Sequence, residues 1–210
     1  GVRKNGSSDA LTDGYQEYQT WIAIGVDDND IFECYIANSS VKVFIVGYIS
    51  DSEGGFLTNT IDKTPSTKES WVDIDISEDT GTDTAVCSFF EVNITQNAGS
   101  GDDYAFRKNG STDNRRHVSP KNMLHGASMS VDGNEILECW VHDYYEVRLN
   151  GWLTDNFTSF TNSIDYSIGT TGSYTDTDFS SDIPSGNSGA FLHIWSSYDF
   201  GSYDFGIRKN

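Results

Sequence analysis

The side chains with the clearest potential for chemistry are acidic and amide residues gathered in two short turns. These are Asp27-Asp28-Asn29-Asp30 and Asp132-Gly133-Asn134-Glu135. Calcium binds carboxylate and carbonyl oxygens, so the candidate ligands are Asp27, Asn29, Asp30, Asp132 and Asn134. Neither turn has the twelve-residue spacing of an EF-hand, and Asp and Asn also favour tight turns for backbone reasons. Calcium, the one cofactor that the sequence suggests, and turn chemistry alone both remain open.

Catalytic chemistry has much weaker support. Ser188 lies in Gly186-Asn187-Ser188-Gly189, a faint echo of the Gly-Asp-Ser-Gly of serine proteases. A nucleophilic serine needs a base and an orienting acid, and no histidine-bearing partner motif accompanies it. The four histidines show no metal-ligand spacing. We therefore predict that the protein is not an enzyme.

One short phrase occurs three times in the chain. Its arginines, Arg3, Arg107 and Arg208, are separated by 107 − 3 = 104 and 208 − 107 = 101 residues. Each copy resembles the end of a strand, and the first two run into an Asn-Gly turn. The phrase predicts a junction between modules or subunits, made by Val2, Arg3, Lys4, Asn5, Phe106, Arg107, Lys108, Asn109, Ile207, Arg208 and Lys209.

The charge of the chain supports a special role for the phrase. The formal net charge is −19, yet eight of the 13 Lys and Arg residues lie in or just after a copy of the phrase. Such an acidic chain disfavours nucleic acid and anionic membrane surfaces as partners. Two interpretations of the basic residues stay open: they fix the register of module contacts, or they protect an edge strand from aggregation.

The pattern of apolar residues predicts an all-β protein. Short β-branched and aromatic runs alternate with polar turns, and no run is long enough for a membrane span. We expect strands near residues 20–26, 31–36, 41–49, 71–76, 85–94, 104–108, 127–131 and 135–141, and a loop with at most one short strand over 50–68.

The predicted strands repeat with the phrase. Asp27 and Asp132, Glu33 and Glu138, and Cys34 and Cys139 are each 105 residues apart. About seven strands per hundred residues are typical of a β-sandwich, and jelly-roll topology is preferred over the immunoglobulin one. We therefore predict two tandem sandwich domains, residues 10–109 and 110–210, preceded by a linking strand at residues 1–9.

The cysteines and the sequons bear on the cellular compartment. Cys34 and Cys139 are repeat-equivalent, which favours buried free thiols, while a Cys34–Cys87 disulfide stays open as the alternative. Five Asn-x-Ser/Thr sequons occur, at Asn5, Asn38, Asn93, Asn109 and Asn156, and would accept glycans in a secreted protein. Asn38 and Asn156 lie in predicted exposed turns. We expect an extracellular protein.

The repeated Arg-Lys-Asn-Gly-Ser phrase and the Val-Asp-x-Asn hairpins resemble the tandem jelly-roll modules of extracellular fibrils and virion-like appendages. The resemblance implies a structural subunit that polymerises head to tail with copies of itself. Such polymerisation could use strand donation. Two placements of residues 1–8 stay open: donation as a strand to a neighbouring subunit, or packing on their own module as an ordinary first strand. The alternative is a carbohydrate-binding or adhesin module that stacks glycans on Trp21, Trp71, Trp152 or Tyr48.

Overall fold

A computed structural model describes residues 2–9, 22–34, 36, 43, 45, 48–95, 103–116, 124–165, 167, 176, 178 and 180–182. The chain divides into two units, Gly1–Asn162 and Ser163–Asn210. Every strand described here belongs to the first unit. In the second unit, the described residues lie in turns and irregular segments.

The described part of the chain contains nine strands and one turn of 3₁₀ helix, Asp51–Glu53. The strands are β1 (Val2–Lys4), β2 (Phe32–Cys34), β3 (Gly54–Asp62), β4 (Val72–Asp75), β5 (Cys87–Ile94), β6 (Tyr104–Lys108), β7 (Leu124–Ser130), β8 (Ile136–Val141) and β9 (Tyr145–Leu153). No α-helix occurs among these residues, so the prediction of an all-β protein is confirmed for them. They also include no helix of the length and apolarity that a membrane span requires.

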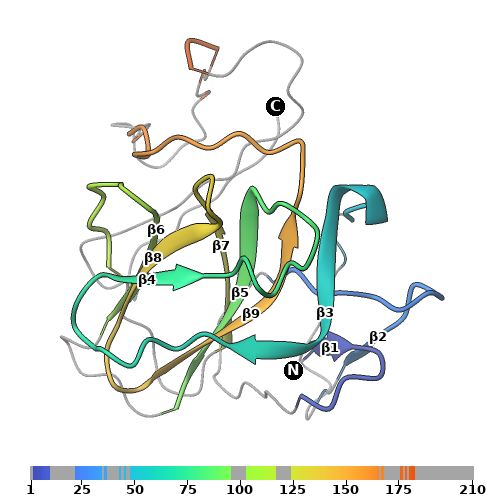
Figure 1. The fold of residues 1–210 in the computed structure, drawn as a ribbon. Coiled ribbons are helices and arrows are strands. Elements are labelled where there is room, and N and C mark those ends of the chain that lie inside the picture. Colours follow the sequence, from blue (N-terminus) through green and yellow to red (C-terminus); the bar gives the residue numbers. More distant parts are fainter. Residues whose placement is uncertain are drawn as a thin grey trace. The chain divides into compact units, whose positions relative to one another are not determined.

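Seven of the strands form a sandwich of two antiparallel sheets (Figure 1). One sheet has the order β3-β9-β5-β7 and the other the order β4-β8-β6. β1 and β2 make a separate two-stranded sheet. We call residues 54–153 the central sandwich.

The core of the central sandwich follows from alternation along its strands. On β4, Ile74 is buried, as is Ile76 just beyond it, while Asp73 and Asp75 are exposed, as the sequence predicts. β5 is buried on both faces, because Phe90, Val92 and Ile94 lie in the main core while Cys87 and Phe89 belong to a second apolar cluster with Leu153, Ala23, Phe56 and Phe157. The largest side chains of the core are aromatic and branched: Phe90, Leu137, Leu149, Tyr145 and Trp152. A few large rings thus fill a thin core.

The expected strands at 71–76, 85–94, 104–108, 127–131 and 135–141 correspond to β4 to β8. Residues 50–68, expected to be mainly loop, instead contain the nine-residue strand β3. Its Thr, Asn and Gly content obscures the strand pattern, and pairing with β9 stabilises it. In the expected first strand, residues 22–26 are not in a strand.

The predicted domain boundary at residue 109 differs from what the sheets show. β4 precedes the boundary and pairs with β8, which follows it; β5 likewise pairs with both β7 and β9. The central sandwich therefore takes its strands from both sides of the second phrase. The physical reason is that β6 is the edge strand of a sheet whose next strand, β8, comes later in the chain.

Candidate functional site

The second copy of the phrase forms a well-defined polar structure, which we call the second junction. β6 pairs with β8 so that Arg107 lies opposite Glu138. Arg107 donates two hydrogen bonds to this carboxylate, Nε to Oε2 and Nη2 to Oε1, both 2.8 Å long. Its guanidinium also lies 4.0 Å from the ring centre of Trp71 and donates to the carbonyl oxygen of Asp113. A bidentate pair stacked on an aromatic ring holds Arg107 in one orientation.

The turn after β6 completes the second junction. Gly110 has a φ of 78°, which explains the Asn-Gly sequence of the phrase. Asn109 donates to the Asp132 carboxylate at 2.8 Å. Ser111 Oγ and the Thr112 amide both donate to Asn162 Oδ1, at 3.0 and 2.8 Å. The phrase is thereby hydrogen-bonded to the Asp132 turn and to Asn162, both of which come later in the chain.

The first copy of the phrase makes a matching set of hydrogen bonds, with one bond in place of two between its arginine and glutamate, and we call it the first junction. Arg3 Nε donates to Glu33 Oε2 at 2.7 Å, and Arg3 Nη1 donates to the carbonyl oxygen of Asp9 at 2.8 Å. Asn5 donates to Asp27 at 2.7 Å. Ser7 Oγ donates to Asn59 Oδ1 at 3.2 Å. Two segments 104 residues apart therefore form one hydrogen-bonding pattern.

Asn59 and Asn162 are junction residues that the sequence analysis missed. Each accepts hydrogen bonds at its Oδ1 from the Ser-Ser or Ser-Thr pair of a phrase. They lie in Leu57-Thr58-Asn59-Thr60-Ile61-Asp62 and Phe160-Thr161-Asn162-Ser163-Ile164-Asp165, which match at a spacing of 103. This spacing is the same as that between Asp73 and Asp176, so the repeat itself contained the signal.

In each of the two acidic turns proposed as calcium sites, the chain engages both carboxylate oxygens of the first aspartate. Asp27 Oδ1 accepts from the amides of Asn29 and Ile31, and Asp132 Oδ1 accepts from those of Asn134 and Ile136. Oδ2 in each case accepts from the asparagine of a phrase. The remaining candidates, Asn29, Asp30 and Asn134, are exposed, and Asp30 has a φ of 61°. No group of three His, Cys, Asp or Glu residues suited to a metal occurs in the described part of the chain.

These hydrogen bonds also set the charge state of the turns. The hydrogen bond from Asn5, followed by that from the Ile31 amide, holds the pKa of Asp27 below its ordinary value. Burial raises the pKa of Asp132, but the Ile136 amide, Asn109 and the Asn134 amide outweigh it and keep the pKa low. The geometry thus accounts for both aspartates as turn residues.

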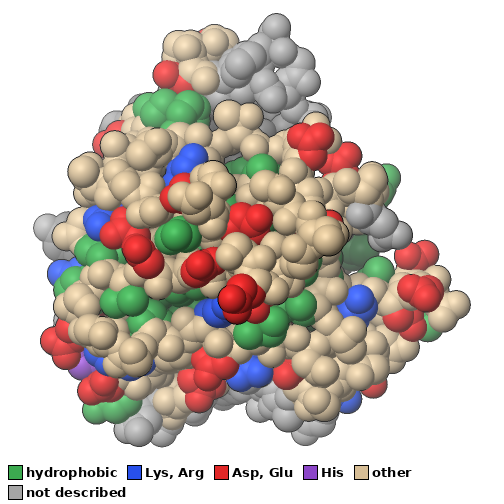
Figure 2. Space-filling view, viewed as in Figure 1, with side chains coloured by type: hydrophobic (Ala, Val, Ile, Leu, Met, Phe, Trp, Pro, Cys, Tyr) green, Lys and Arg blue, Asp and Glu red, His purple; other side chains and the backbone are tan. Residues whose placement is uncertain are grey.

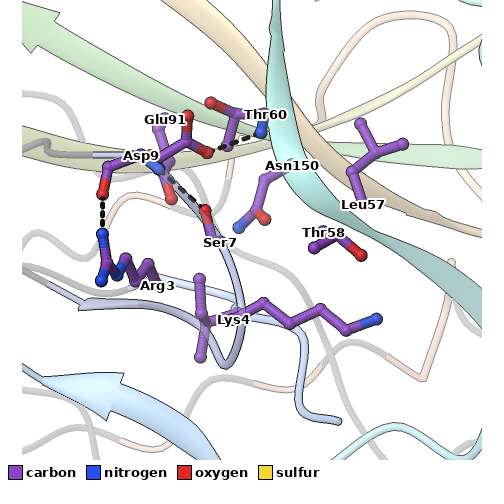
Figure 3. A pocket seen from close by; sticks show the side chains of 10 residues that line it. Arg3, Lys4, Ser7, Asp9, Leu57, Thr58, Thr60, Glu91 and Asn150 are labelled. Atoms are coloured by element: carbon purple, nitrogen blue, oxygen red, sulfur yellow. Dashed lines mark hydrogen bonds between the residues drawn. The ribbon is translucent and has the colours of Figure 1, made fainter.

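The first junction encloses a small cavity against the central sandwich (Figure 3). Asp9 accepts a hydrogen bond from the Thr60 amide at 2.7 Å and lies 3.6 Å from Arg148 Nη2. Arg148 in turn donates to Thr60 Oγ1 at 2.7 Å. The free space is about 10 Å³, which holds one water molecule at most. This is a packed contact and offers no room for a substrate.

Glu91 is the one strongly perturbed carboxylate on the wall of this cavity. Its side chain comes from β5 and the residue is 2% exposed, opposite Arg148 on β9. Burial, followed by repulsion from Asp9, raises the pKa of Glu91 to about 7, and Arg148 opposes this only in part. Carboxylates with a shifted pKa often mark functional sites. Here, however, Glu91 lies where the first junction packs against β3, β5 and β9, with no room for a substrate.

The sequons differ in accessibility. Asn5 and Asn109 use the side-chain nitrogen that would carry a glycan to bond Asp27 and Asp132, and Ser7 and Ser111 of these sequons are buried. Asn93 donates to Glu146. Asn156 is exposed in a turn and donates to Glu53. Asn38 lies outside the described residues.

All three cysteines are free thiols in this structure, so the Cys34–Cys87 disulfide is not formed. Cys87 and Cys139 are buried as expected, and burial raises the pKa of Cys87 to about 12. Cys34 is exposed, contrary to the expectation of a buried thiol. The difference between Cys34 and its counterpart Cys139 shows that the two repeats are covered unequally.

The remaining junction prediction concerns the third copy of the phrase. Ile207, Arg208 and Lys209 lie outside the described residues.

On the face drawn in Figure 2, acidic side chains are spread widely and basic ones lie singly among them. Arg3 and Arg107 pair with glutamates of their own sheets, so in both described copies the arginine fixes strand register.

Comparison with known proteins adds no relative to this picture. No family model matches the chain, and neither a curated protein nor a solved structure does so.

Proposed function

We propose that the protein is a structural subunit of an extracellular filament and assembles head to tail with copies of itself. The observation that supports this proposal is the duplicated junction. The same three pairings, Arg–Glu, Asn–Asp and Ser–Asn, recur after 104 residues. A protein that only folds and binds a small ligand has no need to build one contact twice in succession.

The two junctions use different faces of the central sandwich. The first phrase lies on β3, where Lys4 Nζ donates to the Phe56 carbonyl oxygen and Ser7 donates to Asn59. β3 is an edge strand of the four-stranded sheet. The second phrase includes the end of β6, which is an edge strand of the three-stranded sheet. β6 packs beside β7, and β7 is the edge strand opposite β3 in the four-stranded sheet. A contact between two different surfaces of the same subunit is heterologous. It joins subunits head to tail and does not close into a two-fold dimer.

Electron microscopy of the purified chain tests the proposal. A filament subunit forms long, unbranched fibres in negative stain and sediments as a polymer. A chain that remains monomeric at high concentration, with the central sandwich folded by circular dichroism, would contradict it. A control for surface charge is the same sample at high salt, because contacts made by buried strands resist screening better than exposed ion pairs do.

The alternative function, a carbohydrate-binding or adhesin module, has less support from the aromatic residues. Trp152 is buried, and Trp71 is covered by Arg107 and by the edge of Trp140. Tyr48 is exposed, and Trp21 lies outside the described residues. Retention of a monomeric chain on a glycan column would favour this alternative.

Strand donation by residues 1–8 remains a proposal about how the subunits join. In this structure β1 pairs with β2 of its own chain, with Arg3 opposite Glu33. Donation to a neighbour therefore requires that this pairing be exchanged for an equivalent one.

A further inference from the structure

The central sandwich consists of two halves that depend on each other. The front half is β3 to β5, residues 54–94, and the back half is β6 to β9, residues 104–153. β3, β4 and β5 pair only with strands of the back half, and β6–β8 is the one pairing of the sandwich that lies inside a half. Neither half can satisfy its strand edges alone.

Residues 2–49 are the counterpart of the back half. β1 and β2 pair like β6 and β8, and the Asp27 turn repeats the Asp132 turn. Several apolar residues of segment 22–49, however, are exposed. Ile45 is 84% exposed whereas its counterpart Leu149 is fully buried, and Tyr48 is 93% exposed whereas its counterpart Trp152 is 7% exposed. Val26, Cys34, Ile36 and Val43 are also exposed, and their counterparts Val131, Cys139, Val141 and Val147 are buried.

Residues 157–198 are the counterpart of the front half. Beyond the shared Thr-Asn sequence, two turns repeat. The Thr64 amide donates to Asp62 and the Ser167 amide donates to Asp165. The Ser77 amide donates to Asp75 and the Ser180 amide donates to Asp178. Both pairs of turns are 103 residues apart. The sequence repeat therefore runs back half, front half, back half, front half, and the strand pairings of the described residues join the middle two.

We propose that residues 157–210 of one copy cover the exposed apolar residues of segment 22–49 in a second copy and so complete a sandwich of the central design. This inference rests on the proposed head-to-tail assembly and names the segment that makes the contact. The front half fits because the central sandwich shows it covering Leu149, Trp152 and Cys139. The side chain of Arg3 is 39% exposed. In the completed sandwich Tyr174 of the other copy would cover it, because Tyr174 is the counterpart of Trp71, which stacks on Arg107.

A second copy is favoured over the same chain because of where the two outer halves of the repeat are anchored. The N-terminal half is held at β3 through Asn59. Near the start of the C-terminal half, Ser159 and Asn162 are held by Lys108 at the end of β6 and by Ser111 and Thr112 just beyond it. β3 and β6 lie at opposite edges of the central sandwich. Each half therefore starts from a different side of the molecule, as a head and a tail do.

Two variants with one defective end each test the inference. Ile45→Asp places a charge on the N-terminal half, and Ile164→Asp places one on the C-terminal half, where Ile164 is the counterpart of Ile61 in the sandwich. Asp28→Asn is the control, because Asp28 and its counterpart Gly133 are both exposed. We expect fibres from the control and none from either variant alone. An equimolar mixture should give a one-to-one dimer, twice 23.2 kDa, because one intact tail meets one intact head.

Cys34 reports the same contact in the unmutated chain. Its reaction with a maleimide should be at least tenfold slower in fibres than in the Ile164→Asp variant, since Cys139 is buried in the complete sandwich. Cys87 and Cys139 should not react in either sample.

The other outcomes separate the inference from the proposed function. If both variants form fibres, or Cys34 reacts freely in fibres, assembly uses another surface; the inference fails and the filament proposal stands. If the unmutated chain forms no fibres, the filament proposal fails. A protected Cys34 in that monomer would mean that the chain covers its own segment, and a reactive one that nothing covers it; both overturn the inference. Mixed variants that stay monomeric overturn it as well.

Discussion

Arg3 and Arg107 occupy equivalent places in the repeat but differ in how far they are shielded from water. The side chains of Arg107 and Glu138 are 17% and 14% exposed, against 39% and 41% for Arg3 and Glu33. Breaking a shielded bidentate pair leaves a carboxylate without its partner, so we expect Arg107→Ala to lower the free energy of unfolding by about 2–4 kcal/mol. Arg3→Ala should cost less than about 1 kcal/mol. Urea denaturation measures both, and equal losses would contradict the difference in shielding.

Glu91 should make stability depend on pH. Its pKa is raised to about 7 in the folded chain, above the ordinary value of 4.5, so the folded state holds the proton more tightly. Stability from this group is therefore full below about pH 4.5 and declines as the pH rises towards 7. Glu91→Gln should be more stable than the unmutated chain at pH 8, by roughly 3 kcal/mol, and nearly equal to it at pH 4.5. Urea midpoints at the two pH values test this. A constant difference between the two chains would show that Glu91 does not titrate in this range.

At the scale of elements, strands with a clear alternation were predictable and strands stabilised by partners were not. β4 shows its two faces in the sequence because Ile74 is buried while its neighbours Asp73 and Asp75 face water. β3 contains Gly, Thr and Asn, which carry little strand signal, and it forms because β9 lies beside it. The junction residues in the phrase were found from repetition. Asn59 and Asn162 were missed because a single amide in a polar segment is inconspicuous until its donors are known.

The Ser–Asn pairing that ties each phrase to a strand segment can be tested one junction at a time. Asn59 Oδ1 accepts the Ser8 amide, and Asn162 Oδ1 accepts the Thr112 amide, both at 2.8 Å. We expect Asn59→Ala to accelerate hydrogen exchange at Ser8 by about tenfold, the factor for about 1.4 kcal/mol, and to leave Thr112 unchanged. Asn162→Ala should do the reverse. Exchange of single amides measured by NMR distinguishes the two, and an effect at both sites from either variant would mean that the junctions are coupled.

At the scale of the whole molecule, the repeat was predictable but its division into modules was not. The phrase marks the period, and a natural expectation is that each period folds on its own. The sandwich instead pairs the end of one period with the start of the next, because β8 needs both β4 and β6 as neighbours. A period read from sequence fixes the length of the unit and leaves its starting point free. Only the strand pairings show where a complete core begins, at β3, and ends, at β9.

The third copy of the phrase leads to a prediction about redundancy. Ile207, Arg208 and Lys209 match the residues of β1 in sequence, so we expect them to be able to occupy the place beside β2 where Arg3 meets Glu33. If a neighbour supplies residues 157–210, either strand can fill that place. We expect deletion of residues 1–8 alone, or of 206–210 alone, to leave fibres visible by negative stain. Deletion of both should abolish fibres, because neither terminal copy of the phrase is then left to pair with β2. Circular dichroism controls for the central sandwich. Loss of fibres on deleting residues 1–8 alone would instead make that segment the sole donated strand, and fibres from the double deletion would remove the phrase from assembly altogether.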